Sequence, residues 1–360
     1  MTENIFALLG RRDEPTDAVE EHCKYLGAAL AVHDFHLEIR RVPWDLRGWA
    51  SSLEALRLMA ASWHDRWVLV QYTALAWSAR GFPGKVERVL YTLAKAGAHI
   101  GVVYHDVEPY SGDRLVDHAR RFVQVRTMRS ALRFADAAIF TVPLDKISWI
   151  KGSLDNAHFI PVGPNLPVAE LPAKERPGPE TLCVAVFSIT GGEAGVAETQ
   201  AIVAAVRYAS EKIGKLRLSV FGRNADSAEV ALREGLRGLP VEVSVEGLLE
   251  ESQIVERLGA ADVLLFVRGP ISSRRSSAIA GIACGLPVIA FAGSETAPPL
   301  TDAGVVLVSQ QKQDALNAAL LKVLSDSSYR FELASHSRTV FSEHFSWTSI
   351  AARYASILKK

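Results

Sequence analysis

The chain has 360 residues, of which 49% are apolar, and its 40 basic side chains balance its 40 acidic ones. This length and composition are typical of a globular protein with two domains, because one hydrophobic core rarely grows so large. Zero net charge argues against a dedicated nucleic-acid-binding protein, which is usually basic, so we expect no nucleic-acid partner. Cys23, Cys183 and Cys284 are too scattered for a disulfide framework or a metal site, which favours a reducing cytoplasm.

The N-terminal sequence predicts no signal peptide, because charged residues follow a short apolar run. No apolar run approaches the roughly 20 residues needed to span a bilayer. We therefore expect a protein that is either free in the cytoplasm or peripheral on the inner face of the membrane. The basic stretch 118–134 is either a solvated amphipathic helix or a surface that docks on anionic lipid.

Short apolar runs alternate with amphipathic stretches, such as residues 18–33, along the whole chain. In the first half the apolar runs are residues 4–10, 67–72, 99–106, 137–142 and 158–163. In the second half they are residues 181–189, 216–222, 241–247, 262–267, 286–292 and 304–308. Continuous apolar strands separated by helices predict an α/β fold with parallel sheets covered on both faces.

A stretch rich in proline and charge, residues 164–180, interrupts this alternation. Its composition predicts an interdomain linker, which we place at residues 166–180. The chain is then expected to form two doubly wound Rossmann-like domains, 1–165 and 181–342. Such sheets bind ligands at the carboxyl ends of their strands, so the strand-to-helix loops are the places to look for a site.

The sequence from Gly269 to Ala290 joins a polar loop to a predicted helix of small residues at 277–284. Ser276 or Ser277 is expected to cap the start of this helix, and Gly285 is the residue type that usually follows a helix end. A helix N-terminus binds anions through its free N–H groups and its dipole.

Arg274 and Arg275 lie just before this helix, and a guanidinium group suits phosphate oxygens in bidentate geometry. We favour a phosphate site at this point, because a helix start and two arginines converge there. The alternative is a solvated loop in front of a capped helix.

Five stretches, taken in order, carry a family resemblance. They are VVYHDVEP, DAAIFTVP with HFIPVGPNLP, VEGLLEESQIVERLGAADVLLFV, AIAGIACGLPVIA and the C-terminal FSWTSIAARYASILKK. This series resembles the GT-B-fold glycosyltransferases, especially the large retaining family numbered four, over nearly the whole chain. The third and fourth stretches are similar to that family's donor-binding half, and the last is similar to its closing helix.

The resemblance implies a GT-B fold, in which two Rossmann-like domains face each other across a cleft and residues 343–360 form a helix that returns to the N-terminal domain. It also implies transfer of a sugar from a nucleotide-sugar donor to a hydroxyl acceptor, with retention of configuration and without a metal or other cofactor. The acceptor would be a glycan or a lipid-linked glycan, as in polysaccharide biosynthesis.

The donor loop departs from the family. Aligned on ACGLPV, the two acidic residues that contact the donor in the family fall at Ser272 and Ala280. The loop SITGGEAG also lacks the basic pair that is usual there. We expect the donor to be held instead by Ser272, Ser273, Arg274, Arg275, Ser276 and Ser277. Arg223 either replaces the missing basic pair or is a solvated loop arginine.

The loop YHDVEP follows a predicted strand and carries His105 and Asp106. The resemblance implies that His105 lies near the donor sugar, and a histidine beside an aspartate can also act as a general base on an acceptor hydroxyl. We take both residues as catalytic candidates. The alternative is a histidine that only braces its loop.

Three further loops contribute candidates. Gly10 and Arg11 follow the first strand, where they either meet the donor's phosphates or, with Arg12 and the acidic residues beside them, form a surface ion cluster. Thr16 or Asp17 is expected to cap the helix that follows. Tyr72 and Trp77 would stack on an acceptor sugar, unless they simply pack in the core.

Two rival functions stay open. One is a nucleotide-sugar epimerase on the same fold, which would need acid–base carboxylates in the cleft. The other is a non-catalytic subunit that binds a nucleotide sugar. His33 and His36 have no third ligand in the sequence, so we expect no metal site.

Overall fold

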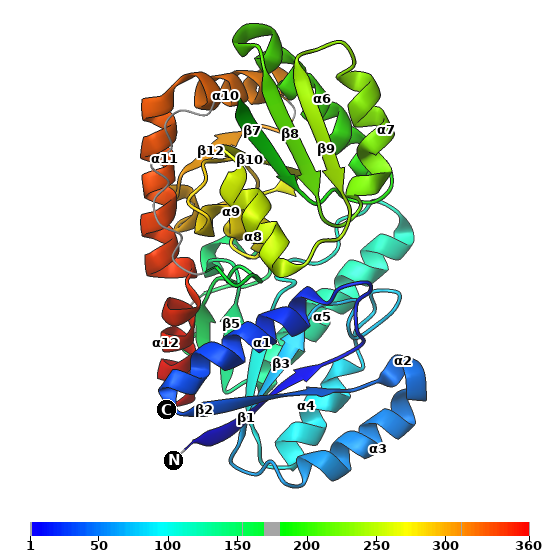
Figure 1. Cartoon of the computed structure of the whole chain (residues 1–360). Coiled ribbons are helices and arrows are strands. Elements are labelled where there is room, and N and C mark those ends of the chain that lie inside the picture. The colour runs from blue at the N-terminus through cyan, green and yellow to red at the C-terminus, as the bar shows by residue number, and fades with distance from the viewer. Residues whose placement is uncertain (1, 153, 169–180, 311, 360) are drawn as a thin grey trace. The chain divides into compact units, whose positions relative to one another are not determined.

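The computed structural model describes residues 2–152, 154–168, 181–310 and 312–359, and the chain divides into two compact units (Figure 1). Unit 1 comprises Met1–Val162 and Trp347–Lys360, and unit 2 comprises Gly163–Ser346. Residues 169–180 of the predicted linker lie outside the described residues. Each unit is built on one six-stranded sheet, and the strands of both sheets are parallel.

The sheet of unit 1 has the strand order β2-β1-β3-β4-β5-β6. Its strands are β1 (Glu3–Leu9), β2 (Phe35–Arg41), β3 (Trp67–Tyr72), β4 (His99–Tyr104), β5 (Ala137–Phe140) and β6 (Ala157–Phe159). The sequence analysis missed β2. It is an edge strand in which exposed polar residues such as His36 and Arg40 alternate with less exposed ones, so it has no continuous apolar run.

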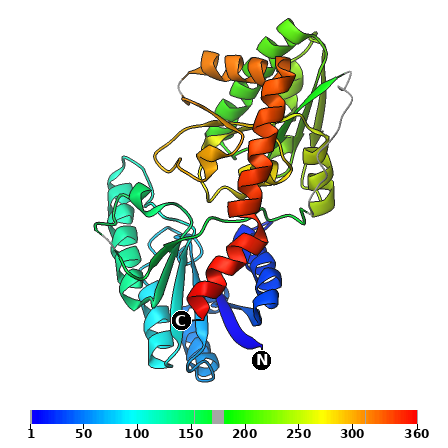
Figure 2. The same cartoon turned by 90° about the vertical axis from the view of Figure 1, so that its left-hand side faces the viewer.

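Helices cover both faces of this sheet. They are α1 (Ala18–Leu30), η1 (Ala31–His33), α2 (Trp44–Arg47), α3 (Trp49–Ala60), α4 (Val86–Lys95), α5 (Leu115–Phe134), η2 (Leu144–Lys146) and α12 (Trp347–Leu358). Side chains of α3, α4 and α5 share one apolar core with Phe6 and Leu8 of β1. Those of α1 and α12 share another core with Ile5. The last helix therefore packs beside α1 in unit 1 (Figure 2).

The sheet of unit 2 has the strand order β12-β11-β10-β7-β8-β9. Its strands are β7 (Leu182–Phe187), β8 (Leu216–Phe221), β9 (Val241–Glu246), β10 (Val263–Pro270), β11 (Val288–Phe291) and β12 (Val305–Val308). Its helices are α6 (Glu193–Ile213), α7 (Ala225–Gly235), α8 (Glu251–Ala260), α9 (Ser276–Ala283), η3 (Leu300–Asp302), α10 (Gln313–Ser325), α11 (Ser327–Val340) and the π-helical turn η4 (Phe341–Phe345).

Close packing explains the small residues of α9. Side chains of α6, α7 and α10 fill the core on one face of the sheet, where Val263 and Leu265 point. Leu264, between them, faces α9: a Cβ atom on Gly281 would lie 2.4 Å from its Cδ2 atom. A larger residue at this position would push α9 away from β10, so the run AIAGIA lets the helix approach the sheet.

Each sheet has a topological switch point, where successive crossovers leave in opposite directions. In unit 1 the chain passes from β1 to β2 on one side and then to β3 on the other. In unit 2 it passes from β7 through β8 and β9, and then to β10 on the opposite side of β7. Ligands of doubly wound sheets bind outside the carboxyl ends of the strands at such points. The loops after β1 and β3, and those after β7 and β10, are therefore the positions at which to examine the chemistry.

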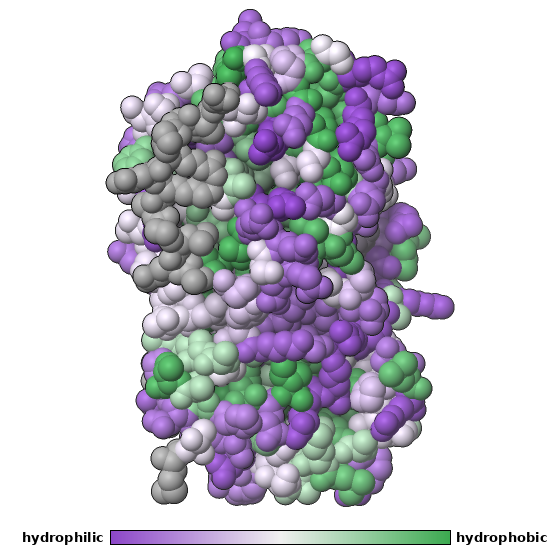
Figure 3. All heavy atoms as spheres, viewed as in Figure 1, coloured by the Kyte–Doolittle hydropathy of each residue, from purple (hydrophilic) through white to green (hydrophobic). Residues whose placement is uncertain are grey.

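Among the described residues, no helix is both long and apolar enough to cross a membrane. On the face shown in Figure 3, apolar residues are interspersed with polar ones in both units. Exposed large apolar side chains such as Leu46, Phe122 and Val230 belong to different helices.

Tyr72 and Trp77 are core residues, and the prediction that they stack on an acceptor sugar is wrong. Their exposed fractions are 0% and 1%, and both belong to the core between the sheet and helices α3–α5. The indole Nε1 of Trp77 donates a hydrogen bond to the Gln71 carbonyl at 2.9 Å. Large aromatic rings at the end of a central parallel strand are covered by the flanking helices, so no face is left for a sugar.

Tyr72 and Tyr104, paired across β3 and β4, give a matched test of this packing. The Tyr104 hydroxyl donates to the Met128 carbonyl at 3.0 Å, whereas the buried Tyr72 hydroxyl has no hydrogen-bond partner among the described residues. Tyr104→Phe is expected to lower the free energy of unfolding by about 1 kcal/mol. Tyr72→Phe is expected to leave it unchanged or to raise it by up to about 1 kcal/mol.

Urea unfolding followed by circular dichroism measures both changes. A loss of stability in Tyr72→Phe as large as in Tyr104→Phe would contradict the burial of an unsatisfied hydroxyl at Tyr72.

Candidate functional site

A cavity of about 230 Å³ opens in unit 1 at its switch point. Its walls come from the loop after β1, the first turn of α1 and the loop after β3. Gln71 and Asp106 add two polar side chains from the ends of β3 and β4. The predicted candidates Gly10, Arg11 and Asp106 are therefore brought together at one place.

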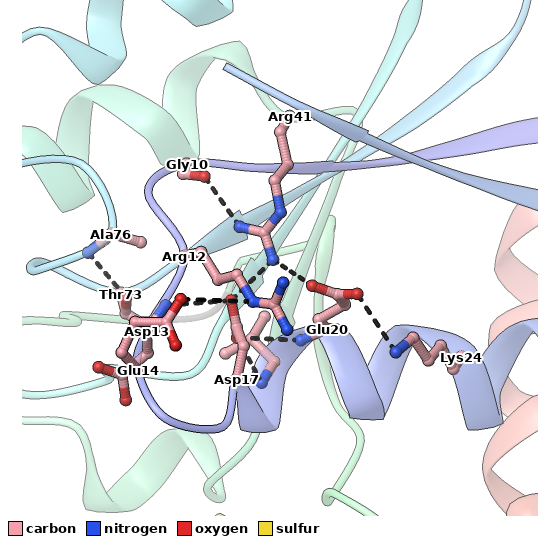
Figure 4. A network of polar contacts seen from close by, with 11 residues as sticks. Gly10, Arg12, Asp13, Glu14, Asp17, Glu20, Lys24, Arg41, Thr73 and Ala76 are labelled. Carbon is pink, nitrogen blue, oxygen red and sulfur yellow. Dashed lines mark hydrogen bonds and ion pairs between the residues drawn. The ribbon is translucent and has the colours of Figure 1, made fainter. Parts of the chain in front are cut away.

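Arg41 at the end of β2 fixes the loop that forms one wall (Figure 4). Its guanidinium donates to the Gly10 carbonyl at 3.0 Å, to Asp17 Oδ2 at 2.7 Å and to Glu20 Oε2 at 2.6 Å. Asp17 also caps α1, as predicted, because its Oδ1 accepts from the backbone N–H groups of Val19 and Glu20 at 3.1 Å each. One arginine thus ties the loop to the helix start.

The same contacts set the charges of this network. Burial alone would raise the pKa of Asp17, but Arg41 and the N–H groups of α1 outweigh it and lower that pKa. The hydrogen bond from Arg41 lowers the pKa of Glu20 as well. Both carboxylates are therefore ionised at neutral pH. They neutralise Arg41, whose role is structural.

Gly10 permits a close approach of two loops. An added Cβ would lie 2.2 Å from the Ala76 carbonyl oxygen, to which the Arg11 N–H donates at 2.8 Å. The Arg11 side chain is partly buried, while Arg12 is exposed and lies 3.9 Å from Glu14 in an ion pair. Arg11 and Arg12 line the cavity, and Arg12 also joins a surface ion pair, as the second alternative for this loop predicted. Contact of this loop with a donor's phosphates stays a prediction.

His105 lies against the polar end of Gln71. The Gln71 amide nitrogen donates to the Leu69 carbonyl at 3.2 Å, which directs its oxygen towards His105 Nε2 at 2.8 Å. Because that oxygen can only accept, the arrangement places a proton on Nε2 of the imidazole. Asp106 is held beside it by the Ala74 N–H, at 2.8 Å from Oδ2.

His22 of α1 is a buried neighbour that the sequence analysis did not single out. Its ring lies edge-on to that of His105, at 5.1 Å between centroids, and 5.2 Å from Trp347. Neither of its ring nitrogens hydrogen-bonds to a residue that the structure describes. Burial, together with the proximity of His105, holds the pKa of His22 well below its usual value, so this ring is neutral. Only the fold brings these two histidines together.

In unit 2 the loop after β10 leads into α9, and one of its predicted caps needs correction. The helix begins at Ser276 with Arg275 in the capping position, and no side chain caps it. Ser276 and Ser277 are inside the first turn instead. The end of the helix is as predicted: Gly285 has φ +69°, and the N–H groups of Gly285 and Leu286 donate to the carbonyls of Ile282 and Gly281.

Arg274, a predicted phosphate ligand, is held by Glu295 from the loop after β11. Its Nε and Nη2 atoms lie 2.6 and 3.1 Å from the two carboxylate oxygens. Burial raises the pKa of Glu295, but Arg274 outweighs it, with smaller contributions from Ser272 and Arg275, and the pKa is lowered. The pair is therefore ionic, and a phosphate must compete with Glu295 for Arg274.

Glu295 lies near Ser272, the position at which the resemblance places an acidic residue. Ser272 and Ser273 are buried, at 1% and 2% exposure, so a ligand reaches them only if this loop moves. The Ser272 hydroxyl is near enough to Glu295 to help lower its pKa, but it makes no hydrogen bond to a described residue. A carboxylate is thus present beside Ser272, supplied by another loop 23 residues along the chain. No local pattern identifies it.

The switch point of unit 2 gathers a second group of charges, Arg223, Arg268 and Glu198. Arg223 follows β8, and its backbone N–H donates to Ser188 Oγ at 3.2 Å. Glu198 of α6 accepts from the Thr190 N–H at 2.8 Å. Burial lowers the pKa of Arg268, the negative charge of Glu198 raises it, and the positive charge of Arg223 lowers it. Sequence analysis missed Arg268, which follows the predicted strand 262–267 by one residue, and Glu198, which lies inside a helix.

No protein-family model and no curated protein sequence matches the chain. Solved structures do match it over its full length. HepE from Anabaena, in complex with UDP and glucose, is 14% identical and has a TM-score of 0.67, with 99% of each chain covered. Sucrose-phosphate synthase from Thermosynechococcus elongatus is 16% identical with a TM-score of 0.67, covering 99% of this chain and 98% of that one.

The chain has the GT-B fold. A putative UDP-N-acetylglucosamine 2-epimerase from Listeria monocytogenes also matches it, at 12% identity and a TM-score of 0.66, covering 100% of this chain and 96% of that one. The GT-B architecture predicted from the sequence is therefore confirmed. The narrower family numbered four stays a prediction.

The Arg41 network predicts a specific dependence of stability on pH. Asp17 and Glu20 have lower pKa values in the folded chain than in the unfolded one, so the stability they contribute is present above about pH 5 and is lost as the pH falls through their folded values. Arg41→Gln is expected to lower the free energy of unfolding at pH 7 by about 1–3 kcal/mol. The free energy of unfolding of this variant should also fall less between pH 5 and pH 3 than that of the wild type.

Urea unfolding of both proteins across this pH range is the measurement. Arg57→Gln is the control, because its partner Glu54 is exposed and solvent screens such an ion pair, so its loss should change the stability little. An Arg41→Gln variant with the same pH slope as the wild type would show that the network does not hold these carboxylates in their ionised form.

Proposed function

We propose that the chain is a glycosyltransferase that transfers a sugar from a nucleoside-diphosphate sugar to a hydroxyl acceptor. The observation that carries the proposal is the position of four arginines at the carboxyl edge of the unit 2 sheet, namely Arg268 at the end of β10 and Arg223, Arg274 and Arg275 in loops. A GT-B fold with such an edge suits a ligand with a diphosphate group. HepE, with UDP and glucose bound, is a structural neighbour that supports the same class of donor.

In this proposal unit 2 binds the donor. When the sugar leaves, negative charge develops on the diphosphate, and fixed guanidinium groups stabilise that charge without reorganising. The N–H groups at the start of α9, which no side chain caps, would add to the same field. This chain would therefore use arginines in place of the acidic donor loop of the family that it resembles.

Unit 1 would bind the acceptor in the cavity at its switch point. A sugar hydroxyl there meets carboxylates of Asp13, Asp17 and Asp106 and the guanidinium groups of Arg11 and Arg12, all of which line the cavity. His105 is the proposed general base, because it follows β4 at the carboxyl edge of the sheet, next to Asp106 of the cavity wall, and Gln71 fixes its ring. Retention of configuration, and catalysis without a metal, belong to this proposal through the family resemblance alone.

A glycan or a lipid-linked glycan is the proposed acceptor, with α5 as the proposed peripheral contact to an anionic membrane. This helix is rich in arginine, but part of that charge is used within unit 1. Arg120, for example, binds the Arg80 carbonyl and Asp117.

Epimerisation of a nucleotide sugar is the second candidate. The putative epimerase among the structural neighbours shares the fold. Glu198 and Glu295 in unit 2 are carboxylates of the kind that such a reaction needs. A non-catalytic nucleotide-sugar-binding subunit is the third outcome that the experiments distinguish.

A panel of UDP-, GDP- and ADP-linked sugars, tested by thermal shift and followed by NMR, separates these functions. A true donor at 100 times its Kd is expected to stabilise the chain by about 2.7 kcal/mol. Slow hydrolysis of the donor supports the transferase, inversion at C2 of the sugar supports the epimerase, and binding without turnover supports the subunit. If no nucleotide or nucleotide sugar stabilises the chain, the proposed function is wrong.

His105→Ala tests the proposed base. Removal of a general base typically lowers kcat by about 10²–10⁴-fold, and we expect this loss with an unchanged Kd for the donor, because His105 belongs to unit 1. His36→Ala, on the exposed edge strand β2, is the matched control and should keep full activity. An equal loss of donor affinity and of kcat in His105→Ala would argue for a donor-binding role instead.

A further inference from the structure

The carboxyl end of β10 contains a bulge. Residues 264–266 of β10 pair in register with 288–290 of β11, but the next pair is Pro270 with Phe291. Val267, Arg268 and Gly269 are therefore extra residues that have no counterpart on β11. Gly269 has φ +69°, a left-handed conformation that suits glycine, and this lets the strand bend at that point. Bulges of this kind change the direction in which side chains point and are frequent beside ligand sites.

Arg268 lies in the middle of this bulge, next to the β7/β10 switch point. It is partly buried, and its Nε atom is inaccessible to solvent. Among the residues that the structure describes, none accepts a hydrogen bond from this Nε. An arginine stays charged at neutral pH, so a buried N–H without an acceptor is costly.

The electrostatic surroundings of Arg268 increase that cost. Burial lowers the pKa of Arg268, the positive charge of Arg223 lowers it further, and Glu198 offsets only part of this. Glu198 also accepts a hydrogen bond from the Thr190 N–H in the loop after β7. Arg268 thus has a positive as well as a negative side chain near it, and its buried Nε has no acceptor among the described residues.

Arg274 shows the opposite situation in the same unit. Glu295 satisfies it with two hydrogen bonds, and this bidentate pair ties the loop after β10 to the loop after β11. A guanidinium that already has a complete partner is a poor candidate for a ligand contact. At Arg268, by contrast, the buried Nε has no acceptor among the described residues.

We propose that Arg268, presented by the β10 bulge at the switch point of unit 2, binds the diphosphate group of the donor together with Arg223. This proposal rests on the proposed function and adds the residues that recognise the diphosphate. A diphosphate has several negatively charged oxygens, so it can accept hydrogen bonds from both guanidinium groups at once and provide an acceptor for Arg268. Arg274 then keeps its structural pair with Glu295.

The inference predicts opposite effects on stability and on binding when Arg268 is replaced by methionine. Methionine keeps the apolar stem but removes the charge and the unsatisfied N–H, so Arg268→Met should have an unchanged or higher Tm in the absence of ligand. Its affinity for UDP and for inorganic pyrophosphate should fall by at least tenfold. An arginine that serves only the structure would lower Tm when removed and leave the affinity unchanged.

Isothermal titration calorimetry with UDP and with inorganic pyrophosphate, together with thermal unfolding, measures both effects. Arg217→Met on the exposed part of β8 is the control for loss of a surface charge and should change neither quantity. Arg274→Met should lower Tm, because it leaves Glu295 buried without its partner, and it should reduce the affinity much less than Arg268→Met. Arg268→Lys keeps the charge but loses the planar fork, and an affinity between those of the wild type and Arg268→Met is expected.

The outcomes separate this inference from the proposed function. If the wild type binds UDP or pyrophosphate and Arg268→Met binds equally well, the inference is wrong and the proposed function stands. If Arg268→Met, and Arg268→Lys with it, unfolds or loses Tm, Arg268 is a structural residue and the inference is again wrong. If the wild type binds neither UDP, pyrophosphate nor a nucleotide sugar, both fail.

Discussion

Parallel strand direction is the constraint on which the candidate sites depend. In a parallel sheet every strand-to-helix loop emerges at the same edge, so polar residues far apart in the sequence become neighbours without any local signal. At the switch point the helices diverge to opposite faces, and the loops on either side leave room for a ligand. In unit 1 this room is the cavity lined by Gln71 and Asp106. In unit 2 it is the carboxyl end of β10, where Arg268 lies in the bulge beside the switch point.

The partners of each arginine distinguish structural from ligand-binding roles. Arg41 is neutralised by two carboxylates and a carbonyl, and Arg274 by a bidentate carboxylate, so both stabilise loops. Arg268 differs, because its buried Nε has no acceptor among the described residues and its pKa is lowered by burial and by the charge of Arg223. A buried guanidinium N–H without an acceptor is unfavourable until an anion binds. Perturbed ionisable groups of this kind are concentrated at functional sites.

The fold was predictable from the sequence because continuous apolar strands and helix ends are local features. Gly285 is an example, since one residue type and its neighbours decide the helix end. The edge strand β2 escaped detection because only one of its faces is buried, and Trp77 was misassigned because its burial depends on distant helices. Glu295 and Arg268 could not be identified in advance. The role of Glu295 arises from a contact between two loops, and that of Arg268 from a bulge that no sequence pattern predicts.

A crystal structure of the chain with bound UDP tests the central claim most directly, because it locates the diphosphate among four candidate arginines. The account predicts diphosphate oxygens within hydrogen-bond distance of the Arg268 and Arg223 guanidinium groups, with the Arg274–Glu295 pair intact. A diphosphate bound to Arg274 and Arg275 at the start of α9, with that pair broken and Arg268 making no contact, would contradict it.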